Sequence, residues 1–482
     1  MRRLQTSAVY HHRFQFCALL LAVAAVVTAL HSTPVSAGSV PAESTIALQT
    51  ADALPLPGSF QVVNNEPGDQ TNPHVECNLV TYTNDDIMGR SIIHYYDLAT
   101  STDNEIPGDD VDLLSVVSGS HIAYTEVDYP GDHIMIFDTV SQTRTVVPGW
   151  GRANPSIGGN LVAFEDRSSQ PAGQWGIATI GLYDLSSGTV SQLTDNSAHN
   201  SFPSVSPNGD AVVWQKCDYD GFNCDVYAAV QTSPGVFATR QLTGAGGQER
   251  FARTNGDLAV YVSDRNGDND IYYQPVTGGA EVRLAIAGDQ RWPTISENLI
   301  SFQSQGQNGY DYDIFVYDII SRKLYRVTST PQVAETLGEI DVCDGVGRLV
   351  YLGVSNGSFD TLNFTFQVPG STRDEINDLI SLVRSFNLPH GTENSLVTKL
   401  ESALAAIGTS DPATACSSLS AFINQCQAQS GKKLTGQQAA QLITAATQIK
   451  TALCPGAANA AALHTSFVDC KKSVPINLAR CS

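Results

Sequence analysis

The sequence predicts an all-β propeller of seven blades, followed by a C-terminal all-α domain of four helices. The first observation behind this prediction is a short apolar run that ends in an aromatic residue and recurs seven times, 40 to 50 residues apart. These marker aromatics are Tyr82, Tyr124, Phe164, Trp214, Tyr261, Phe302 and Tyr351. A repeat of this length, built from several short strands, is typical of a propeller, in which each repeat forms one blade.

Each repeat within residues 58–369 follows one plan. A short strand, with a proline at Pro73, Pro155, Pro203 or Pro293 in four of the repeats, precedes a polar turn and the strand that ends in the marker aromatic. A polar hairpin and two more strands complete the unit. The runs are rich in Val, Ile, Tyr and Phe and are bounded by Gly, Asn and Asp, which favours strands. We expect the marker aromatics to fill the space between neighbouring blades.

The second observation concerns closure of the ring. The last unit, residues 339–366, contains three recognisable strands and no obvious fourth. Residues 59–75 have the same form as residues 190–205, where a closing strand and a loop precede the next unit. We therefore expect the strand at residues 60–64 to complete the seventh blade and to leave no open sheet edge there. Six blades is the alternative if the first or second unit is irregular.

Two segments resemble the repeats of TolB-like propellers: FPSVSPNGDAVVWQ at residues 202–215 and YVSDRNGDNDIYYQPVTGG at residues 261–279. In that family a proline and a Ser-Pro-Asp-Gly-like turn precede one strand, and an Asp-rich turn precedes an Ile-Tyr strand. Asn208 stands here where the family often has Asp. The resemblance implies a periplasmic or extracellular propeller that binds proteins or glycans, and it implies no single activity.

The third observation is a change of period at residue 371. Ile376, Leu379, Ile380 and Val383 have helical spacing, and further helices are predicted over residues 395–407, from residue 412 and from residue 435. Four amphipathic helices with short connections form a bundle over residues 370–455.

Parts of this bundle, NLPHGTENSLVTKLESAL at residues 387–404 and LSAFINQCQAQSGKKLTGQQAAQLI at residues 419–443, closely resemble the bacterial FIMAH domain. That resemblance implies an accessory interaction module without established catalysis. Residues 456–482 are expected to form a cysteine-containing tail.

The N-terminus reads as a secretory signal peptide, residues 1–37. Arg2, Arg3 and Arg13 form a basic start, and residues 17–30 form an apolar run that is short for a spanning helix. Cleavage after Ala37 fits the small residues there, and an uncleaved anchor is the alternative. Residues 38–57 are expected to form a linker. Because no later stretch is apolar enough to span a membrane, we expect a soluble protein that is secreted or periplasmic.

The charge excludes one class of partner. The chain has a formal net charge of -21, and residues 58–369 contain 39 Asp and Glu against 15 Lys and Arg. Nucleic-acid binding requires clustered basic residues, so we expect no nucleic-acid partner. Residues 370–482 contain 7 acidic and 9 basic residues, and this contrast supports two domains.

Nine cysteines remain after the signal peptide, and in an oxidising compartment most of them should pair. We expect a local disulfide between Cys217 and Cys224, and a bridge between Cys77 and Cys343 that locks the closure of the ring. The remaining candidates, which should attach the tail to the bundle in a pairing that the sequence leaves open, are Cys416, Cys426, Cys454, Cys470 and Cys481. An odd number leaves at least one cysteine free or intermolecular.

Alternating acids at Asp264, Asp268 and Asp270 could bind Ca²⁺ through oxygen ligands, which would be the one cofactor of this protein. The alternative is a hairpin turn in which Gly267 takes a positive φ and the acids are solvated or accept backbone hydrogen bonds.

We expect a non-catalytic scaffold that binds a protein or glycan partner at the propeller face, with the helical domain as a docking module. The alternative is a propeller enzyme, a polysaccharide lyase or glycosidase, which would need converging carboxylates and a basic residue. The acids after the marker aromatics, where such a cluster would lie, are Asp85, Glu126, Glu165, Asp166 and Asp264. A purely structural surface protein is a third possibility.

Overall fold

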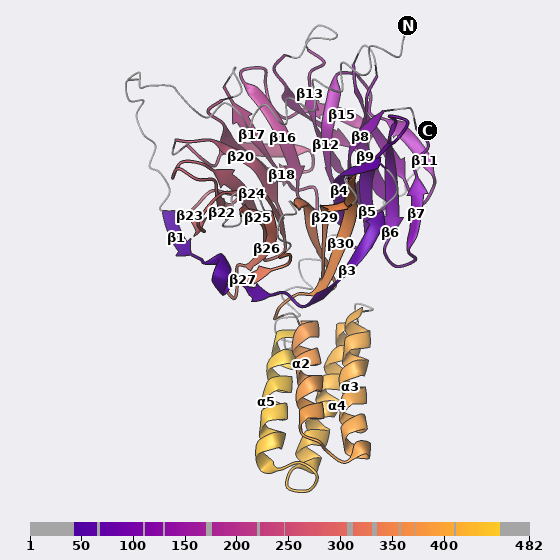
Figure 1. Ribbon diagram of the computed structural model, residues 1–482, viewed down its shortest axis with the longest axis vertical. Helices are drawn as coiled ribbons and strands as arrows, with labels where there is room; N and C mark the ends of the chain where they lie inside the picture. The colour runs from indigo at the N-terminus through magenta and orange to yellow at the C-terminus, as the bar shows by residue number, and fades with distance from the viewer. Residues whose placement is uncertain are drawn as a thin grey trace, which may run out of the picture. The chain divides into compact units, whose positions relative to one another are not determined.

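The computed structural model describes residues 43–64, 68–108, 111–128, 131–169, 176–218, 222–244, 246–305, 312–329, 335–355, 358–370, 372–408 and 411–453. Within these residues the strands form seven sheets, and four helices follow them in the chain (Figure 1). The predicted fold class, a seven-bladed propeller with a C-terminal four-helix region, is confirmed. The predicted signal peptide and the tail at residues 456–482 lie outside the described residues.

Every blade is an antiparallel sheet whose first strand pairs with the second, the second with the third and the third with the fourth. The strands of blades 1 to 3 are β4 (Gly68–Glu76), β5 (Leu79–Asp86), β6 (Ser91–Asp97), β7 (Thr102–Glu105), β8 (Asp112–Ser118), β9 (His121–Glu126), β10 (His133–Asp138), β11 (Thr143–Val146), β12 (Arg152–Gly158), β13 (Leu161–Asp166), β14 (Thr179–Asp184) and β15 (Thr189–Gln192). Those of blades 4 to 6 are β16 (His199–Val205), β17 (Ala211–Cys217), β18 (Asp225–Ser233), β19 (Val236–Gln241), β20 (Glu249–Thr254), β21 (Leu258–Ser263), β22 (Asp270–Pro275), β23 (Glu281–Ala285), β24 (Gln290–Ser296), β25 (Leu299–Gln305), β26 (Tyr312–Asp318) and β27 (Lys323–Arg326).

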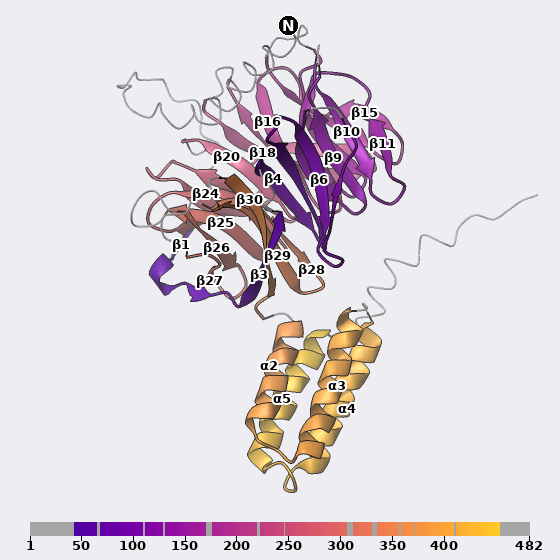
Figure 2. The ribbon, with the colours of Figure 1, turned by 45° about the vertical axis from the view of Figure 1, so that its right-hand side comes forward.

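Blade 7 joins the two ends of the propeller sequence. It contains β28 (Thr336–Cys343), β29 (Val346–Ser355) and β30 (Ser358–Gln367), and its fourth strand is β3 (Gly58–Asn64). The register places Phe60 opposite Phe364, and Figure 2 shows β3 beside β30. Closure of the ring by a strand from the N-terminal side is therefore confirmed.

The seven first strands form the inner ring of the propeller. Each contacts the first strand of the next blade, in the order β4, β8, β12, β16, β20, β24 and β28, and β28 contacts β4 again. Propeller blades are arranged around a central channel, and we use that word for the space that these seven strands enclose.

Residues 43–55 differ from the predicted linker. β1 (Glu43–Ala47) pairs in parallel with β23, and β2 (Leu54–Pro55) pairs in parallel with β27, so blades 5 and 6 each gain a fifth, outer strand. Ile46 and Leu48 pack against the apolar cluster of these blades, and Leu56 is buried. Because β1 has five residues and β2 has two, the segment is too short to show a strand period, although its apolar side chains and its backbone both find partners.

All seven marker aromatics are buried, as predicted. Trp214 of blade 4 packs in one cluster with Ala163 and Ile180 of blade 3, and Tyr82 of blade 1 packs with Val350 of blade 7. The polar atoms of four of these rings, those of Tyr82, Tyr124, Trp214 and Tyr261, form hydrogen bonds, and Trp214 Nε1 donates to Asn200 Oδ1 at 3.0 Å. The propeller core therefore consists of layers between blades, each containing one of these rings.

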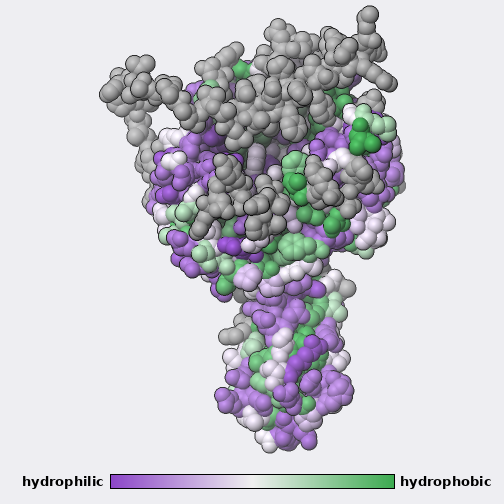
Figure 3. Space-filling model, in the orientation of Figure 1, coloured by the Kyte–Doolittle hydropathy of each residue, from purple (hydrophilic) through white to green (hydrophobic). Residues whose placement is uncertain are grey.

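The helices are α2 (Thr372–Ser385), α3 (His390–Gly408), α4 (Pro412–Gln429) and α5 (Gly436–Leu453). Their buried side chains, among them Leu379, Leu400, Phe422 and Leu442, form one apolar core, while Figure 3 shows a largely hydrophilic surface on the helical region. The second helix begins at His390, five residues before the predicted start. In the described part of the chain, no helix is both long and apolar enough to cross a membrane.

Candidate functional site in the central channel

The first strand of each blade contains a register shift near its start. In six blades the bulged residue has a left-handed conformation, with φ between 49° and 58°. These bulge residues are Asn72, Leu114, Asn154, Phe202, Phe251 and Trp292. A bulge changes the direction in which side chains point. Proline can directly follow the bulge residue, because the ladder needs no backbone N–H at that position. In blade 7 the shift lies at Gly338, where a Cβ would overlap the carbonyl oxygen of Pro73.

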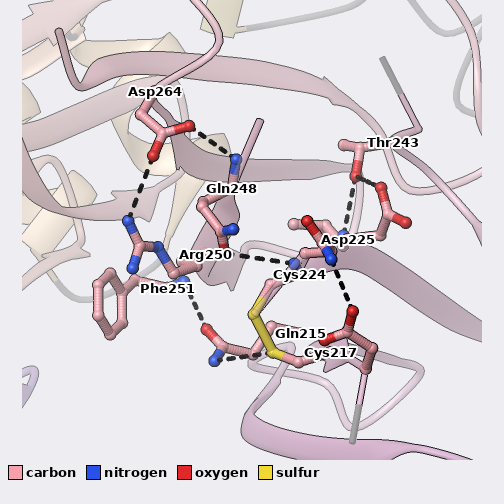
Figure 4. The surroundings of a disulfide bond; sticks show 12 residues. Gln215, Cys217, Cys224, Asp225, Thr243, Gln248, Arg250, Phe251 and Asp264 are labelled. Atoms are coloured by element: carbon pink, nitrogen blue, oxygen red, sulfur yellow. Dashed lines mark hydrogen bonds and ion pairs between the residues drawn. A yellow bond between two sulfur atoms is a disulfide. The ribbon is translucent and has the colours of Figure 1, made fainter. Parts of the chain in front are cut away.

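Three of the bulge residues are held by the preceding blade. The backbone N–H of Asn154 donates to Thr125 Oγ1 at 3.1 Å, and that of Phe202 donates to Glu165 Oε1 at 3.1 Å. The N–H of Phe251 donates to Gln215 Oε1 at 3.2 Å (Figure 4). A backbone donor that the bulge removes from the ladder is thus satisfied by a side chain of the second strand next door. These hydrogen bonds fix the backbone of the three residues at the inner ring.

Three of the bulge residues form what we call the aromatic arc: Phe202 of blade 4, Phe251 of blade 5 and Trp292 of blade 6. The ring centroids of Phe202 and Phe251 are 5.3 Å apart, and those of Phe251 and Trp292 are 4.4 Å apart. Phe202 is 37% exposed and Trp292 is 40% exposed. Rings of this size are usually buried in a protein interior, so the arc offers a preformed apolar surface.

Polar groups flank the arc on the residues just before the bulges. Arg250 lies 3.7 Å from Asp264, and Arg291 lies 3.4 Å from Asp289. The Arg291 guanidinium also lies over the ring of Tyr312, 4.7 Å from its centroid. Each pair is partly exposed, so it can donate and accept hydrogen bonds with a ligand that lies on the arc.

A second set of side chains follows two residues after the bulges. In blades 3 and 6 these are Ser156 and Thr294, which accept hydrogen bonds from backbone N–H groups of the next first strand, at 2.9 Å and 3.2 Å. In blade 1 it is His74, and in blade 7 the first paired residue after the shift is Glu339, which directly follows Gly338; the Nδ1 and Oε2 atoms of the two are 2.6 Å apart. The equivalent residue in blade 5 is Arg253. Most positions of this set therefore connect neighbouring blades.

Arg253 is different. Among the described residues it makes no hydrogen bond or ion pair, although its electrostatic interaction with Glu339 spans from blade 5 to blade 7. The two groups therefore lie within electrostatic range of each other, on the first strands of blades 5 and 7. Burial lowers the pKa of Arg253, yet the residue keeps some exposure to solvent. Both facts fit a guanidinium that is enclosed by protein and reached by water in the channel.

Glu339 shows the same combination. Its side chain is 31% exposed, and burial acts to raise its pKa, but His74 and Arg253 outweigh burial and the pKa lies below its usual value. Glu339 is thus an ionised carboxylate whose direct partner is His74, with Arg253 at longer range.

Three more carboxylates lie at the far ends of the first strands. Burial raises the pKa of Glu76, Glu297 and Asp341, and their mutual repulsion and that of Glu339 add to the shift. Asp341 Oδ2 accepts from the Cys77 N–H at 2.7 Å. The channel therefore carries an aromatic, partly cationic section near the strand starts and an acidic section near the strand ends.

Two predicted disulfides are present. Cys77 bonds to Cys343, which joins β4 of blade 1 to β28 of blade 7. Cys217 bonds to Cys224 within blade 4, beside Gln215 and Gln248 (Figure 4).

The cysteines of the helices differ from each other. Cys416 is disulfide-bonded, whereas Cys426 is free, which corrects its prediction as a disulfide partner. Cys426 lies on the buried stripe of α4 and packs as a small apolar residue, and burial raises its thiol pKa to about 12. Cys454, Cys470 and Cys481 lie outside the described residues.

The predicted calcium ligands do not fit a calcium site. Asp264 accepts from the Gln248 N–H at 2.7 Å and faces Arg250, while Asp270 is buried and pairs with Arg283 at 2.8 Å. The carboxylates of Asp264, Asp268 and Asp270 do not form a group of ligand atoms. Within the described residues, the group of potential ligand atoms that lie together is Cys77, Asp341 and Cys343. Because those two cysteines form a disulfide, that group is no metal centre either.

The five acids after the marker aromatics do not converge. Glu126 pairs with Arg144, Glu165 with Arg167 and Asp166 with Arg152, each inside its own blade. Asp85 accepts from Ser91 at 2.5 Å, and Asp264 is held as described above. The converging set, Glu76, Glu297, Glu339 and Asp341 with His74, lies on the first strands instead. The sequence signal for the channel was the residue before the repeated proline, which is aromatic in Phe202 and Trp292 and Asn in two other blades.

No family model and no curated protein matches the sequence. Among solved structures, TolB from Acinetobacter baumannii is 17% identical, with a TM-score of 0.36 over 61% of this chain and 78% of that one. The β-propeller domain of the Trilobed protease from Pyrococcus furiosus is 11% identical, with a TM-score of 0.47 over 63% of this chain and 96% of that one.

A puromycin hydrolase is 16% identical, with a TM-score of 0.48 over 65% of this chain, and the match spans about half of that protein (55%). No family and no function is concluded from similarities of this size.

Proposed function

We propose that the protein is an exported, non-catalytic propeller that binds a protein or glycan partner on the aromatic arc, with the FIMAH-like helical region as a docking module. The exposed aromatic arc is the observation that carries this proposal. Phe202 and Trp292 lie on strands that the ring holds rigidly, so a ligand meets them without ordering a loop.

The backbone of the arc supports a functional role. Asn adopts a left-handed conformation readily, whereas for a bulky residue such as Phe251 or Trp292 it costs about 1–2 kcal/mol. Strained residues of this kind gather at sites of function. Blades 1 and 3 use Asn72 and Asn154 at the same position. Asn is thus sufficient for the fold at this position, so we infer that the aromatic residues have a role in binding.

Export is part of the proposal. Two disulfides within the propeller are expected of an oxidising compartment, and the predicted signal peptide with cleavage after Ala37 leads there. Mass determination of the protein recovered from the periplasm and from the medium tests this: a mature chain that begins at Gly38 is expected, and a full-length cytoplasmic chain would contradict it.

The binding role is tested by substitution in the arc. Panels of peptides and of oligosaccharides are screened with the purified protein, and each ligand found is titrated against Trp292→Ala and Phe202→Ala. Removal of a stacking ring should weaken binding by ~10-fold or more. Phe222→Ala is the matched control, because Phe222 is also an exposed aromatic (59%) but lies in the hairpin of blade 4. Ligands whose affinity is the same for all three variants would contradict the proposal.

A second candidate function, a polysaccharide lyase or glycosidase, is favoured by one observation. The channel brings together carboxylates whose pKa values move in opposite directions, lowered for Glu339 and raised for Glu76 and Asp341. Such pairs supply a general base and a general acid in glycosidases. Release of reducing ends or unsaturated products from polysaccharides, with Ca²⁺ or Mn²⁺ present and absent, tests this candidate. Activity that Glu339→Gln abolishes would establish it in place of the scaffold.

A further inference from the structure

Arg253, in the channel, differs from most arginines of the propeller. Arg253 makes no hydrogen bond or ion pair among the described residues, whereas most arginines of the propeller, such as Arg144, Arg152 and Arg265, pair with a carboxylate. An enclosed guanidinium without a direct partner retains five N–H donors for a ligand. Since Glu339 is bonded directly to His74, its charge is shared, and the donors of Arg253 stay available.

The position of Arg253 relates it to the arc. Phe251 and Arg253 are two residues apart on β20, so the guanidinium follows the central ring of the arc along the channel. A ligand that lies on Phe251 and Trp292 and continues into the channel meets Arg253 next. That ligand therefore combines an apolar group with an anion at its leading end.

We propose that the channel binds the C-terminal end of a polypeptide, with its terminal carboxylate paired to Arg253 and its last apolar side chains on the aromatic arc. This inference rests on the proposed function and names its partner. A carboxylate and a guanidinium form two parallel charge-assisted hydrogen bonds, which gives a chain terminus both affinity and direction.

Charge favours a peptide over an acidic polysaccharide. The whole chain carries a net charge of -21, and Glu76, Glu297 and Asp341 lie beyond Arg253 in the channel. A polyuronate carries one negative charge per sugar and is repelled by such a surface. A peptide terminus brings a single carboxylate to Arg253, and basic residues upstream of it would be attracted to the acidic propeller.

The test is a selection from a library of peptides that are displayed with free C-termini, using the full-length protein as bait. Enriched sequences are then synthesised as free acids and as C-terminal amides and titrated by calorimetry. We expect apolar last residues, and we expect amidation to weaken binding ~10-fold or more, because it removes the charged hydrogen bonds. This comparison uses the unaltered protein, so it does not depend on the folding of a variant.

Substitution gives the second measurement. Arg253→Gln should weaken binding of the free acid and have little effect on the amide, while Arg240→Gln, the same change on the outer strand β19, should change neither. Equal binding of acid and amide would overturn the inference, and so would a selection that enriches nothing over the Arg253→Gln protein.

Two further outcomes separate the inference from the proposed function. If Trp292→Ala abolishes binding while Arg253→Gln does not, the arc is a binding site and the carboxylate assignment is wrong. If trigalacturonic acid binds in an Arg253-dependent way and no peptide does, Arg253 binds an anion as inferred, but the ligand is a saccharide. That result would overturn the inference that the ligand is a polypeptide.

Discussion

Blades 3, 4 and 5 have the same backbone bulge in their first strands, but the bulge residue is Asn in blade 3 and aromatic in blades 4 and 5. In blades 3, 4 and 5 the bulge N–H is accepted by Thr125, Glu165 and Gln215 of the preceding blades, and the φ values are 56°, 53° and 56°. The residues that make these bonds are Asn154, Phe202 and Phe251. Since the geometry is equal and only the side chains differ, the bulge is a device of the fold, and the aromatic side chains of blades 4 to 6 are available for binding.

The largest expected effect concerns the seam between blades 7 and 1. Replacing Cys77 and Cys343 with Ser removes a link between residues 266 positions apart, against seven for Cys217 and Cys224. The loop-entropy relation gives a loss of roughly 5 kcal/mol for the first pair and roughly 2 kcal/mol for the second. Guanidinium unfolding of both double variants, followed by fluorescence, measures the difference. A costlier loss from the short loop would show that the seam is held by other contacts.

The second prediction concerns the buried residue two positions before the bulge. Blades 1 and 6 carry Gln70 and Gln290 there, and blade 5 carries Glu249. Burial raises the pKa of Glu249 to about 7 from the usual 4.5. The neutral form is favoured in the folded state, so stability is retained below about pH 4.5 and lost as the pH rises towards 7.

Glu249→Gln removes this dependence, because the amide does not ionise. It should raise the free energy of unfolding at pH 8 by up to about 3 kcal/mol and leave it nearly unchanged at pH 4. Thermal unfolding at both pH values, beside the exposed control Glu105→Gln, checks the prediction. An equal shift at both pH values would mean that ionisation of Glu249 is not the cause.

Gly338 of blade 7 gives the third prediction. A Cβ there would overlap the carbonyl oxygen of Pro73, so Gly338→Ala forces blades 7 and 1 apart at the seam. We expect a loss of about 1–3 kcal/mol, as for other overpacked sites. Gly436→Ala, in open space at the start of α5, is the control. Calorimetric unfolding of the two variants compares them, and an unchanged midpoint for Gly338→Ala would show that the seam can relax.

The smallest expected effect tests the comparison itself. Phe202→Asn gives blade 4 the residue that blade 3 already has at this position. Asn relieves the left-handed strain but loses the contact with Phe251, so the free energy of unfolding should change by less than about 0.5 kcal/mol, while ligand binding weakens. A large loss of stability would mean that the arc belongs to the core.

The sequence predicted the parts of this protein that depend on repetition. Seven marker aromatics located seven blades, because a buried ring between blades is needed once per repeat. The closing strand β3 and the bridge between Cys77 and Cys343 followed from the likeness of one repeat to another. The outer strands β1 and β2 were missed because they are short, and the strands that pair with them are more than 200 residues away.

The channel was missed for a different reason. The side chains of Arg253, Glu339 and His74 come from three blades and meet only when the ring is closed. In sequence they are single residues at equivalent positions of divergent repeats, without a shared motif. The acids at the ends of the second strands were the predicted location of a catalytic cluster. Two of them, Glu126 and Glu165, pair with arginines inside their own blades.

The position of β3 in blade 7 has a consequence for how the molecule is made. Its register partner β30 lies about 300 residues later, so a ribosome has delivered all of the other six blades before the last one can be completed. Until then β3 has no partner strand, and a pairing across so many residues is slow to form. The last step of folding therefore involves one of the first segments to be synthesised. A chain that ends before blade 7 leaves β3 without its partner strand β30.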